Sequence, residues 1–349
     1  RSDYDNSMTF YKRVVREYPR TAEATEALAG LRNVYMDKSD FDGYLSYAAT
    51  LGDFARLDNG EQDSLLYVSA ERLYLRSDFK SALPAFQKYL QALPGGRFAL
   101  NAYYYLGDCF YREQNSAEAL KLFSYVADQP RNLFTEDALL RQGELLYAAK
   151  DYSQSLFIFE RLERESELED NRVEAIIGQM RSQRKLGDYN RCVTIADKVM
   201  SMPKVSPEIL REARYLYAQS LLELNRREAA MPVLKQLMVN TKSVEGAEAK
   251  YLYAWLLNES GKDEAAEQEI FDYIEQGTPH QYWLARAFVV LSDIYHNRKE
   301  DLQAIQYLES LKSNYSGEDD IQTMIDERLS KWKESSGSVS PSDEGVSVK

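Results

Sequence analysis

The stretch that decides the fold covers residues 101–130 and reads NAYYYLGDCFYREQNSAEALKLFSYVADQP. Its first half carries apolar residues three and four positions apart, at Tyr103, Leu106 and Phe110, which is the spacing of one helix face. A short polar break at 112–115 separates this helix from a second apolar run, which a proline ends. The stretch therefore predicts two consecutive helices joined by a tight turn.

This two-helix pattern recurs along the chain at a nearly constant period. Alanines mark equivalent positions 36 to 38 residues apart, and Leu65 fills the one slot that lacks an alanine. The seven alanines are Ala27, Ala102, Ala138, Ala175, Ala213, Ala249 and Ala287. A period of this size is typical of solenoids, in which one unit is copied and neighbouring units bury each other's apolar faces. We expect the second of these units to begin near Leu65.

Two small residues stand twelve positions apart in most units, one in each predicted helix. Gly143 and Ser155 are one such pair. Small side chains let two helices approach closely, so each pair is expected at a helix–helix contact. The turns between the helices read Ser-Asp-Phe at 77–79, Lys-Asp-Tyr at 150–152 and Gly-Asp-Tyr at 187–189. Each predicts a helix stop followed by an aspartate N-cap.

The pattern Tyr-x-x-Leu-Gly-x-x-Phe, then Ala-x-x-x-Phe, then Pro resembles the tetratricopeptide repeat (TPR) from end to end of the chain. The resemblance implies an all-α, right-handed superhelical solenoid of about eight repeats. Residues 1–20 match the second helix of a truncated preceding repeat, and residues 21–317 hold eight repeats. Residues 318–333 predict a capping helix, and the Ser- and acid-rich tail 334–349 is expected to be disordered.

The first joint between repeats carries a further resemblance. Residues 10–31 are similar to a joint of bacterial envelope TPR proteins, namely the lipoprotein of the outer-membrane β-barrel assembly machine and the TolA-binding protein. This resemblance implies a periplasmic or outer-membrane-associated protein, and a cytoplasmic location is the alternative. Because the chain enters at half a repeat, an apolar helix face is exposed at its start, and we expect further repeats upstream of Arg1.

Composition and motifs disfavour several function classes. The formal charge of −13 and pI near 4.9 argue against nucleic acid or an anionic membrane as partners. The sequence contains no stretch of 18 consecutive apolar residues, so we expect no direct insertion into a membrane. No phosphate loop, dinucleotide fingerprint or nucleophile elbow occurs. The sequence therefore predicts a protein that is not an enzyme and has no cofactor or metal.

The rarer residues fit the same prediction. Cys109 and Cys192 lie more than two repeats apart, so we expect two free thiols. His280 and His296 lack the spacing of metal ligands, and packing or surface roles are expected for both. The acidic run 163–170 predicts a solvated loop.

The candidate binding surface is the face of the first helices, which lines a concave groove in TPR proteins. Two consecutive repeats present tyrosine–acid–tyrosine on this face, and a third nearly does. The candidate groove residues are Tyr67, Glu71, Tyr74, Tyr104, Asp108, Tyr111, Glu144, Tyr147, Arg181, Arg184, Tyr215, Tyr251 and Trp255. In one interpretation the tyrosines pack between repeats. In the other they form an aromatic, acidic wall for a partner segment.

These observations predict a non-catalytic scaffold that binds a peptide or helix of a partner protein in its groove. A basic or aromatic segment would complement the predicted wall. Two alternatives remain open, a cytoplasmic adaptor or regulatory module and a structural array that self-associates through its apolar open end.

Overall fold

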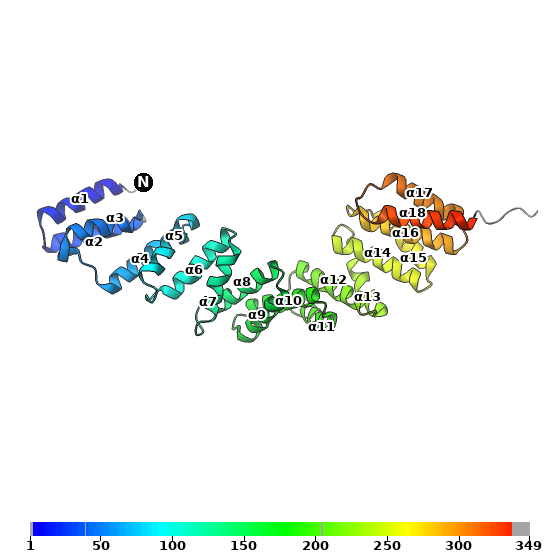
Figure 1. The fold of residues 1–349 in the computed structure, drawn as a ribbon, viewed down its shortest axis with the longest axis horizontal. Helices are drawn as coiled ribbons and strands as arrows, with labels where there is room; N and C mark the ends of the chain where they lie inside the picture. Colours follow the sequence, from blue (N-terminus) through cyan, green and yellow to red (C-terminus); the bar gives the residue numbers. More distant parts are fainter. Residues whose placement is uncertain (1–2, 39, 204, 337–349) are drawn as a thin grey trace, which may run out of the picture. The chain divides into compact units, whose positions relative to one another are not determined.

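The structure, a computed structural model, describes residues 3–38, 40–203 and 205–336 (Figure 1). The described residues form α-helices and one short 3₁₀ helix, which confirms the predicted all-α fold. The predicted tail beyond Ser336 lies outside the described residues. The chain divides into two compact units, one up to Gln179 and one from Met180 onward.

The first unit begins with the lone helix α1, which the sequence predicts as the second helix of a truncated repeat. Its helices are α1 (Tyr4–Glu17), α2 (Ala22–Asp37), α3 (Phe41–Thr50), η1 (Gly52–Ala55), α4 (Asn59–Leu75), α5 (Phe79–Ala92), α6 (Ala99–Arg112), α7 (Ser116–Ala127), α8 (Thr135–Ala148) and α9 (Tyr152–Glu165). Consecutive helices pack against each other, and α4 also contacts α6. From α2 to α17, even-numbered helices are the first helices of repeats and odd-numbered helices are the second.

Helix α10 (Glu169–Leu186) carries the boundary between the two units. The second unit continues with α11 (Tyr189–Met200), α12 (Pro207–Glu223), α13 (Arg227–Leu237), α14 (Val244–Glu259), α15 (Asp263–Gln276), α16 (Gln281–Asn297), α17 (Asp301–Asn314) and α18 (Ile321–Ser336). The first helices α12, α14 and α16 contact each other in turn, and α18 contacts α16 and α17. Helix α18 occupies the place predicted for a capping helix, with its bounds shifted three residues toward the C-terminus.

The predicted turn signals are confirmed at the start of the second helices. The side chains of Asp78, Asp151 and Asp188 each accept a hydrogen bond from the backbone amide three residues later. Each aspartate follows a residue with a left-handed backbone, and Lys150, at φ 64°, is one of these. A helix stop and a helix start are thus joined in a single tight turn.

The predicted contacts between small residues are also confirmed. The Ser155 hydroxyl donates to the carbonyl of Gly143 at 2.9 Å, and the Ser292 hydroxyl donates to the carbonyl of Ala304. Such contacts require two helix backbones to approach closely. The glycines also seat the aromatic rings of second helices, because a Cβ at Gly143 would lie 2.7 Å from the buried ring of Phe159.

The start predicted for the second repeat, near Leu65, is wrong by six residues, since α4 begins at Asn59. A capping box at Asp58 explains why α4 begins earlier than predicted. The Asp58 side chain accepts from the amide of Glu61 at 2.7 Å, and the Glu61 carboxylate accepts from the amide of Asp58 at 3.2 Å. This reciprocal pair satisfies two amides that the first turn leaves free.

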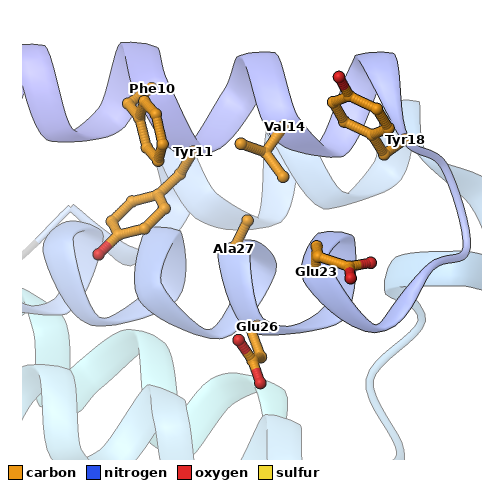
Figure 2. Close-up of a pocket in the computed structure, with 7 residues that line it drawn as sticks. All are labelled: Phe10, Tyr11, Val14, Tyr18, Glu23, Glu26 and Ala27. Atoms are coloured by element: carbon orange, nitrogen blue, oxygen red, sulfur yellow. The ribbon is translucent and has the colours of Figure 1, made fainter.

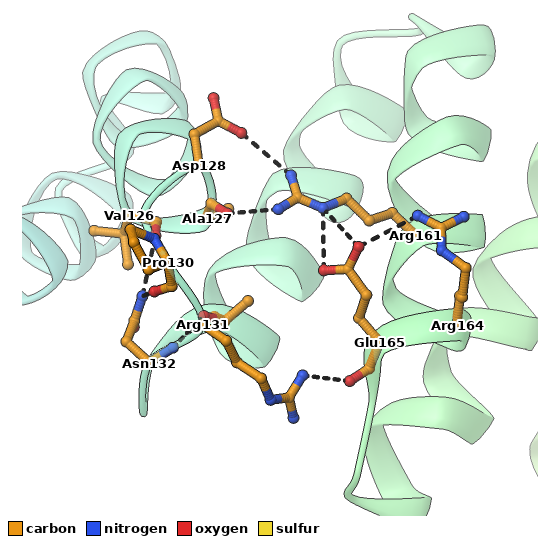
Figure 3. Close-up of polar contacts among 10 residues, drawn as sticks. Val126, Ala127, Asp128, Pro130, Arg131, Asn132, Arg161, Arg164 and Glu165 are labelled. Carbon is orange, nitrogen blue, oxygen red and sulfur yellow. Dashed lines mark hydrogen bonds and ion pairs between the residues drawn. The ribbon is translucent and has the colours of Figure 1, made fainter.

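The expectation of a solvated loop over residues 163–170 is confirmed only for a short link at 166–168 with exposed residues, and it is wrong at the two ends of the run, which are helical. Helix α9 continues to Glu165 and α10 begins at Glu169. Figure 3 shows the reason, because the Arg161 guanidinium bonds to the Glu165 carboxylate at 3.2 Å and to the carbonyl of Ala127 at 2.6 Å. Arg131 donates to the carbonyl of Glu165 from the previous joint. Arg161 and Arg131 therefore join the end of α9 to the preceding repeat.

Candidate peptide-binding groove

The tyrosine of the first predicted triad is a packing residue. Tyr67, on α4, is 3% exposed, and its ring stacks on Phe98 with centroids 4.6 Å apart. Its hydroxyl donates to Glu71 at 2.7 Å. Burial, together with this carboxylate, raises the pKa of Tyr67 well above its ordinary value. Tyr67 and Glu71 thus satisfy each other within one helix.

The next residues of the predicted wall bridge successive first helices. Tyr74, on α4, donates its hydroxyl to Asp108 on α6 at 2.7 Å. Asp108 is 6% exposed and also accepts from Arg112. Tyr104 stacks on Phe134 with centroids 4.3 Å apart. A buried carboxylate needs such partners, so Asp108 contributes to the joint between repeats.

The third triad is paired as well, although its residues are less buried. Glu144 accepts from Arg141 at 2.9 Å, and the Arg141 guanidinium lies over the ring of Tyr111 at 5.0 Å. Tyr147 packs against Tyr152 with centroids 5.2 Å apart. The acidic character predicted for this wall is therefore offset by arginines on the same helices.

In the second unit, contacts again run from one first helix to the next. Arg181 forms a two-fold hydrogen bond with Glu212, both at 2.7 Å. Arg184 reaches Gln219 at 3.4 Å, and Tyr215 donates to Glu248 at 2.7 Å. The two arginines, which interrupt the aromatic pattern in the sequence, thus hold α10 to α12.

The acceptors of these bonds occupy a repeated position. Glu212 and Glu248 stand immediately before the marker alanines Ala213 and Ala249. Asp137, which stands before Ala138, lies 3.5 Å from the Tyr104 hydroxyl in the same way. We call these contacts the inter-repeat ladder. Sequence reasoning missed it, although an acid before the marker alanine of the next repeat was a readable signal.

One part of the groove face is hollow. A cavity of about 200 Å³ opens between α14, α16 and α18 in the second unit. Tyr251 and Trp255, two candidate groove residues, line it. Tyr251 stacks on Trp283 at 5.7 Å, and the half-buried ring of Trp255 lies beneath the Arg227 guanidinium at 5.4 Å.

The polar wall of this cavity consists of charges that are already paired. Arg328, on α18, binds Asp293 through two nitrogens at 2.7 and 2.8 Å. Arg286 lies over the ring of Tyr251 at 5.1 Å and pairs with Asp320. Fixed ion pairs beside two aromatic rings make a shaped, half-apolar hollow, which we call the groove pocket.

The histidines take structural positions. His296 hydrogen-bonds Asp301 at 2.6 Å and stacks on Trp332 at 4.3 Å. His280 contacts the carbonyl of Lys242 at 3.1 Å. Among the described residues, no group of three or more His, Cys, Asp or Glu side chains is placed to hold a metal ion. In the same residues, no helix is both long and apolar enough to cross a bilayer.

Comparison with known protein families finds matches to repeat models in several parts of the chain. A family model described as tetratricopeptide repeat matches residues 67–133 and 215–282. A second tetratricopeptide repeat model matches residues 137–165. No curated protein matches the chain.

Several solved structures are similar in fold. A tetratricopeptide repeat protein from Parabacteroides merdae is 15% identical, with a TM-score of 0.42, over 76% of this chain and 98% of that one. YrrB, described as a TPR protein with an unusual peptide-binding site, is 19% identical, with a TM-score of 0.44, over 53% of this chain and 90% of its own. The TPR domain of P58(IPK) is 11% identical, with a TM-score of 0.29, over 97% and 100%.

Proposed function

The chain is a tetratricopeptide repeat protein, and we propose that it is a non-catalytic scaffold that binds a segment of a partner protein through its groove face. The groove pocket is the observation that carries this proposal. Elsewhere on the face, most candidate side chains are paired with a neighbouring side chain, either near them on the same face or through the inter-repeat ladder. At the pocket, the half-buried Trp255 and the buried Tyr251 have such contacts too, but they also border open space.

The size and lining of the groove pocket determine which kind of ligand group it can bind. A volume of about 200 Å³ is below the roughly 300–1,000 Å³ of a small-molecule or cofactor site. It has room for one large side chain of a bound segment. The Tyr251 ring already contacts Trp283 and Arg286, so the Trp255 indole is the ring left to attract an aromatic side chain by ring–ring contact, or a lysine or arginine by cation–π contact. The partner segment is therefore aromatic or basic at its anchoring residue.

The test compares two aromatic positions in native partner capture. Trp255→Ala removes a wall of the pocket, and partners of the wild-type chain are expected to be lost. Phe271→Ala is the matched control, because Phe271 is an exposed ring on the second helix α15, and partners are expected to remain. Equal capture by both variants would rule out the pocket as the anchor.

A second comparison tests the tyrosine wall of the first unit. Tyr104→Ala with Tyr111→Ala removes two of its rings, and circular dichroism checks that the helices persist. If the wall binds a partner, this double variant loses it. If the rings only pack between repeats, the melting temperature falls and the partners stay.

The proposed location is a bacterial cell envelope, in the periplasm or at the outer membrane. The joint at residues 10–31 supports it by its resemblance to envelope TPR proteins. Osmotic-shock fractionation of the native cells tests it, and recovery in the cytoplasmic fraction would favour a cytoplasmic adaptor instead. A structural array would differ from both, because light scattering would then show a mass that rises with concentration.

A further inference from the structure

A cavity of about 760 Å³ lies between two repeats of the first unit, the helix pairs α2–α3 and α4–α5. We call it the α3–α5 cavity, because the start of α3 and one face of α5 form its sides and α4 forms its floor. It differs from the hollow in Figure 2, which borders the lone helix α1 and would be covered by a preceding repeat. Both walls of the α3–α5 cavity belong to complete helix pairs, so no further repeat is expected to fill it.

Two small residues open this cavity. Ser69 of α4 and Ala85 of α5 line it, and they stand four and twenty positions after the marker residue Leu65. The next repeat holds Leu106 and Leu122 at these two positions. Every other repeat also holds a side chain larger than serine at the first position and larger than alanine at the second. The cavity is therefore a departure from the repeat pattern that occurs in this one repeat.

The next repeat also shows what kind of group fills the equivalent place. Its Tyr103 and Tyr125 stand one and twenty-three positions after Ala102 and pack together, with ring centroids 4.3 Å apart. The corresponding residues of the α4–α5 repeat are Leu66 and Lys88, and both line the cavity. This repeat thus lacks two rings that its neighbour has, and the space suits an aromatic ring from outside the chain.

The lining combines an apolar surface with a buried hydroxyl that has no partner. Phe41, Leu66 and Leu73 supply apolar surface. Ser69 is 7% exposed, and its hydroxyl makes no hydrogen bond within the described residues. Since a buried polar group normally has a hydrogen-bond partner, this hydroxyl favours a ligand with a polar atom.

The charges at the rim favour an anionic ligand. Lys80 of α5 is exposed and, in the part of the chain that the structure describes, makes no ion pair or hydrogen bond. The acids of the lining are already engaged, since Asp40 and Asp78 cap α3 and α5. Asp42 pairs with Lys88 across the cavity. Lys80 therefore adds a positive charge that no side chain matches, and it attracts an anionic group.

We propose that the α3–α5 cavity binds a small aromatic molecule that carries an anionic group, such as a carboxylate or a sulfonate. The ring lies on the apolar surface of the lining, Ser69 donates to a polar atom of the ligand, and the anionic group pairs with Lys80. The volume lies within the roughly 300–1,000 Å³ of small-molecule sites. This site is formed by the first unit and the groove pocket by the second, so the proposal does not depend on partner binding.

The probe is anilinonaphthalene sulfonate, an aromatic sulfonate whose fluorescence rises in apolar surroundings, titrated into the full chain. Exposed rings such as Phe10 also attract this dye, so the measured quantity is the binding that a cavity variant removes. Ser69→Leu with Ala85→Leu restores the leucines of the next repeat and is expected to weaken binding about tenfold or more. Ala229→Leu with Ser310→Leu, at exposed small residues of α13 and α17, is the matched control and leaves binding unchanged. Circular dichroism checks that both variants keep their helices.

Two further comparisons test the charge of the ligand. Lys80→Glu lies at an exposed position and is expected to weaken dye binding about tenfold. Lys235→Glu makes the same charge change at an exposed lysine of α13 and leaves binding unchanged. Thioflavin T, a cationic aromatic dye, is expected to bind the wild type and the double-leucine variant equally, because the cavity does not attract it.

Four results would overturn the proposal. One is binding of the sulfonate dye that is equal in the double-leucine variant and its control. Another is equal weakening by both lysine variants, because net charge rather than Lys80 would then attract the dye. Loss of thioflavin T binding in the double-leucine variant would show that the cavity prefers cations. Loss of a captured partner protein in that variant, with dye binding unchanged, would assign the cavity to a partner segment instead of a small molecule.

Discussion

Replacing Gly178 by alanine tests the packing of one joint in detail. The ring of Phe159 is held between Gly143 of α8 and Gly178 of α10. A Cβ at Gly178 would lie 2.5 Å from Cδ2 and 2.6 Å from Cγ of this ring, well inside the 3.4 Å at which ordinary contact begins. The ring has little room to retreat, because its other side faces the α8 backbone so closely that a Cβ built on Gly143 would lie 2.7 Å from it.

Two opposing free-energy contributions determine how much Gly178→Ala should change the free energy of unfolding. Overpacking a buried site costs about 1–3 kcal/mol. Alanine is favoured over glycine inside a helix by about 1 kcal/mol. Because the ring is confined on both sides, the overpacking term is expected near its upper end. The free energy of unfolding of the first unit should therefore fall by about 1–2 kcal/mol.

Urea denaturation followed by circular dichroism measures this change, and a double-mutant cycle identifies its cause. Phe159→Ala removes the ring atoms, Cγ included, that meet the new methyl group. In that background, Gly178→Ala should become neutral or stabilising, since only the helix preference remains. Gly60→Ala is the control and should not destabilise, because a Cβ at this helical glycine would meet only Asp58 Oδ1, at an ordinary contact distance of 3.4 Å. If Gly178→Ala alone leaves the chain as stable as the wild type, our reasoning about the joint is wrong.

Three further predictions concern charge, thiol chemistry and backbone. Burial alone would raise the pKa of Glu136, but donors from the amides of Glu167 and Leu168, and from Asn171 and Arg131, hold it below the usual 4.5. Glu136→Gln should cost about 1–3 kcal/mol at neutral pH, and the wild-type advantage should vanish in urea titrations as the pH falls below 4.5, because a lowered folded-state pKa stabilises only above it. Burial raises the pKa of the Cys109 thiol from 9.0 to about 12, so a thiol reagent at pH 8 should leave it unmodified until urea unfolds the chain. The stability from this protonated thiol is complete below pH 9 and is lost as the pH rises toward 12, so Cys109→Ala should flatten the alkaline decline. Lys150→Gly should raise the melting temperature by relieving about 0.5–1 kcal/mol of left-handed strain at φ 64°, and an unchanged or lower value would contradict that reading of the turn.

Much of the fold could be predicted from short sequence patterns, namely residue spacing, helix caps and turns. Some residues have roles that are set by the backbone close to them, so their spacing in the sequence predicts those roles. They are the marker alanines, the aspartates at 78, 151 and 188, and the pair Gly143 and Ser155. The start of α4 could have been predicted by the same means, since Asp58 and Glu61 form a readable capping box.

The candidate site was harder to predict, because its side chains choose between solvent and a neighbouring repeat. Tyr67 and Trp255 occupy comparable faces in the sequence. In the structure, Tyr67 is covered by Phe98, whereas Trp255 borders a cavity. Whether such a ring is covered or borders a cavity depends on residues of the neighbouring repeat, and the sequence pattern of one repeat alone does not contain that information. The ladder acids show that comparing successive repeats, rather than reading each alone, recovers part of this information.

The central claim is that the groove pocket receives a side chain of a partner protein. A photo-crosslinking residue placed at Asn258, which lines the pocket, tests this claim most directly when the full chain is irradiated in its native cells. We predict a discrete crosslinked partner from Asn258 that Trp255→Ala abolishes, and no such product from the same probe at Phe271. Equal crosslinking from both positions, or a product that persists in Trp255→Ala, would contradict the claim.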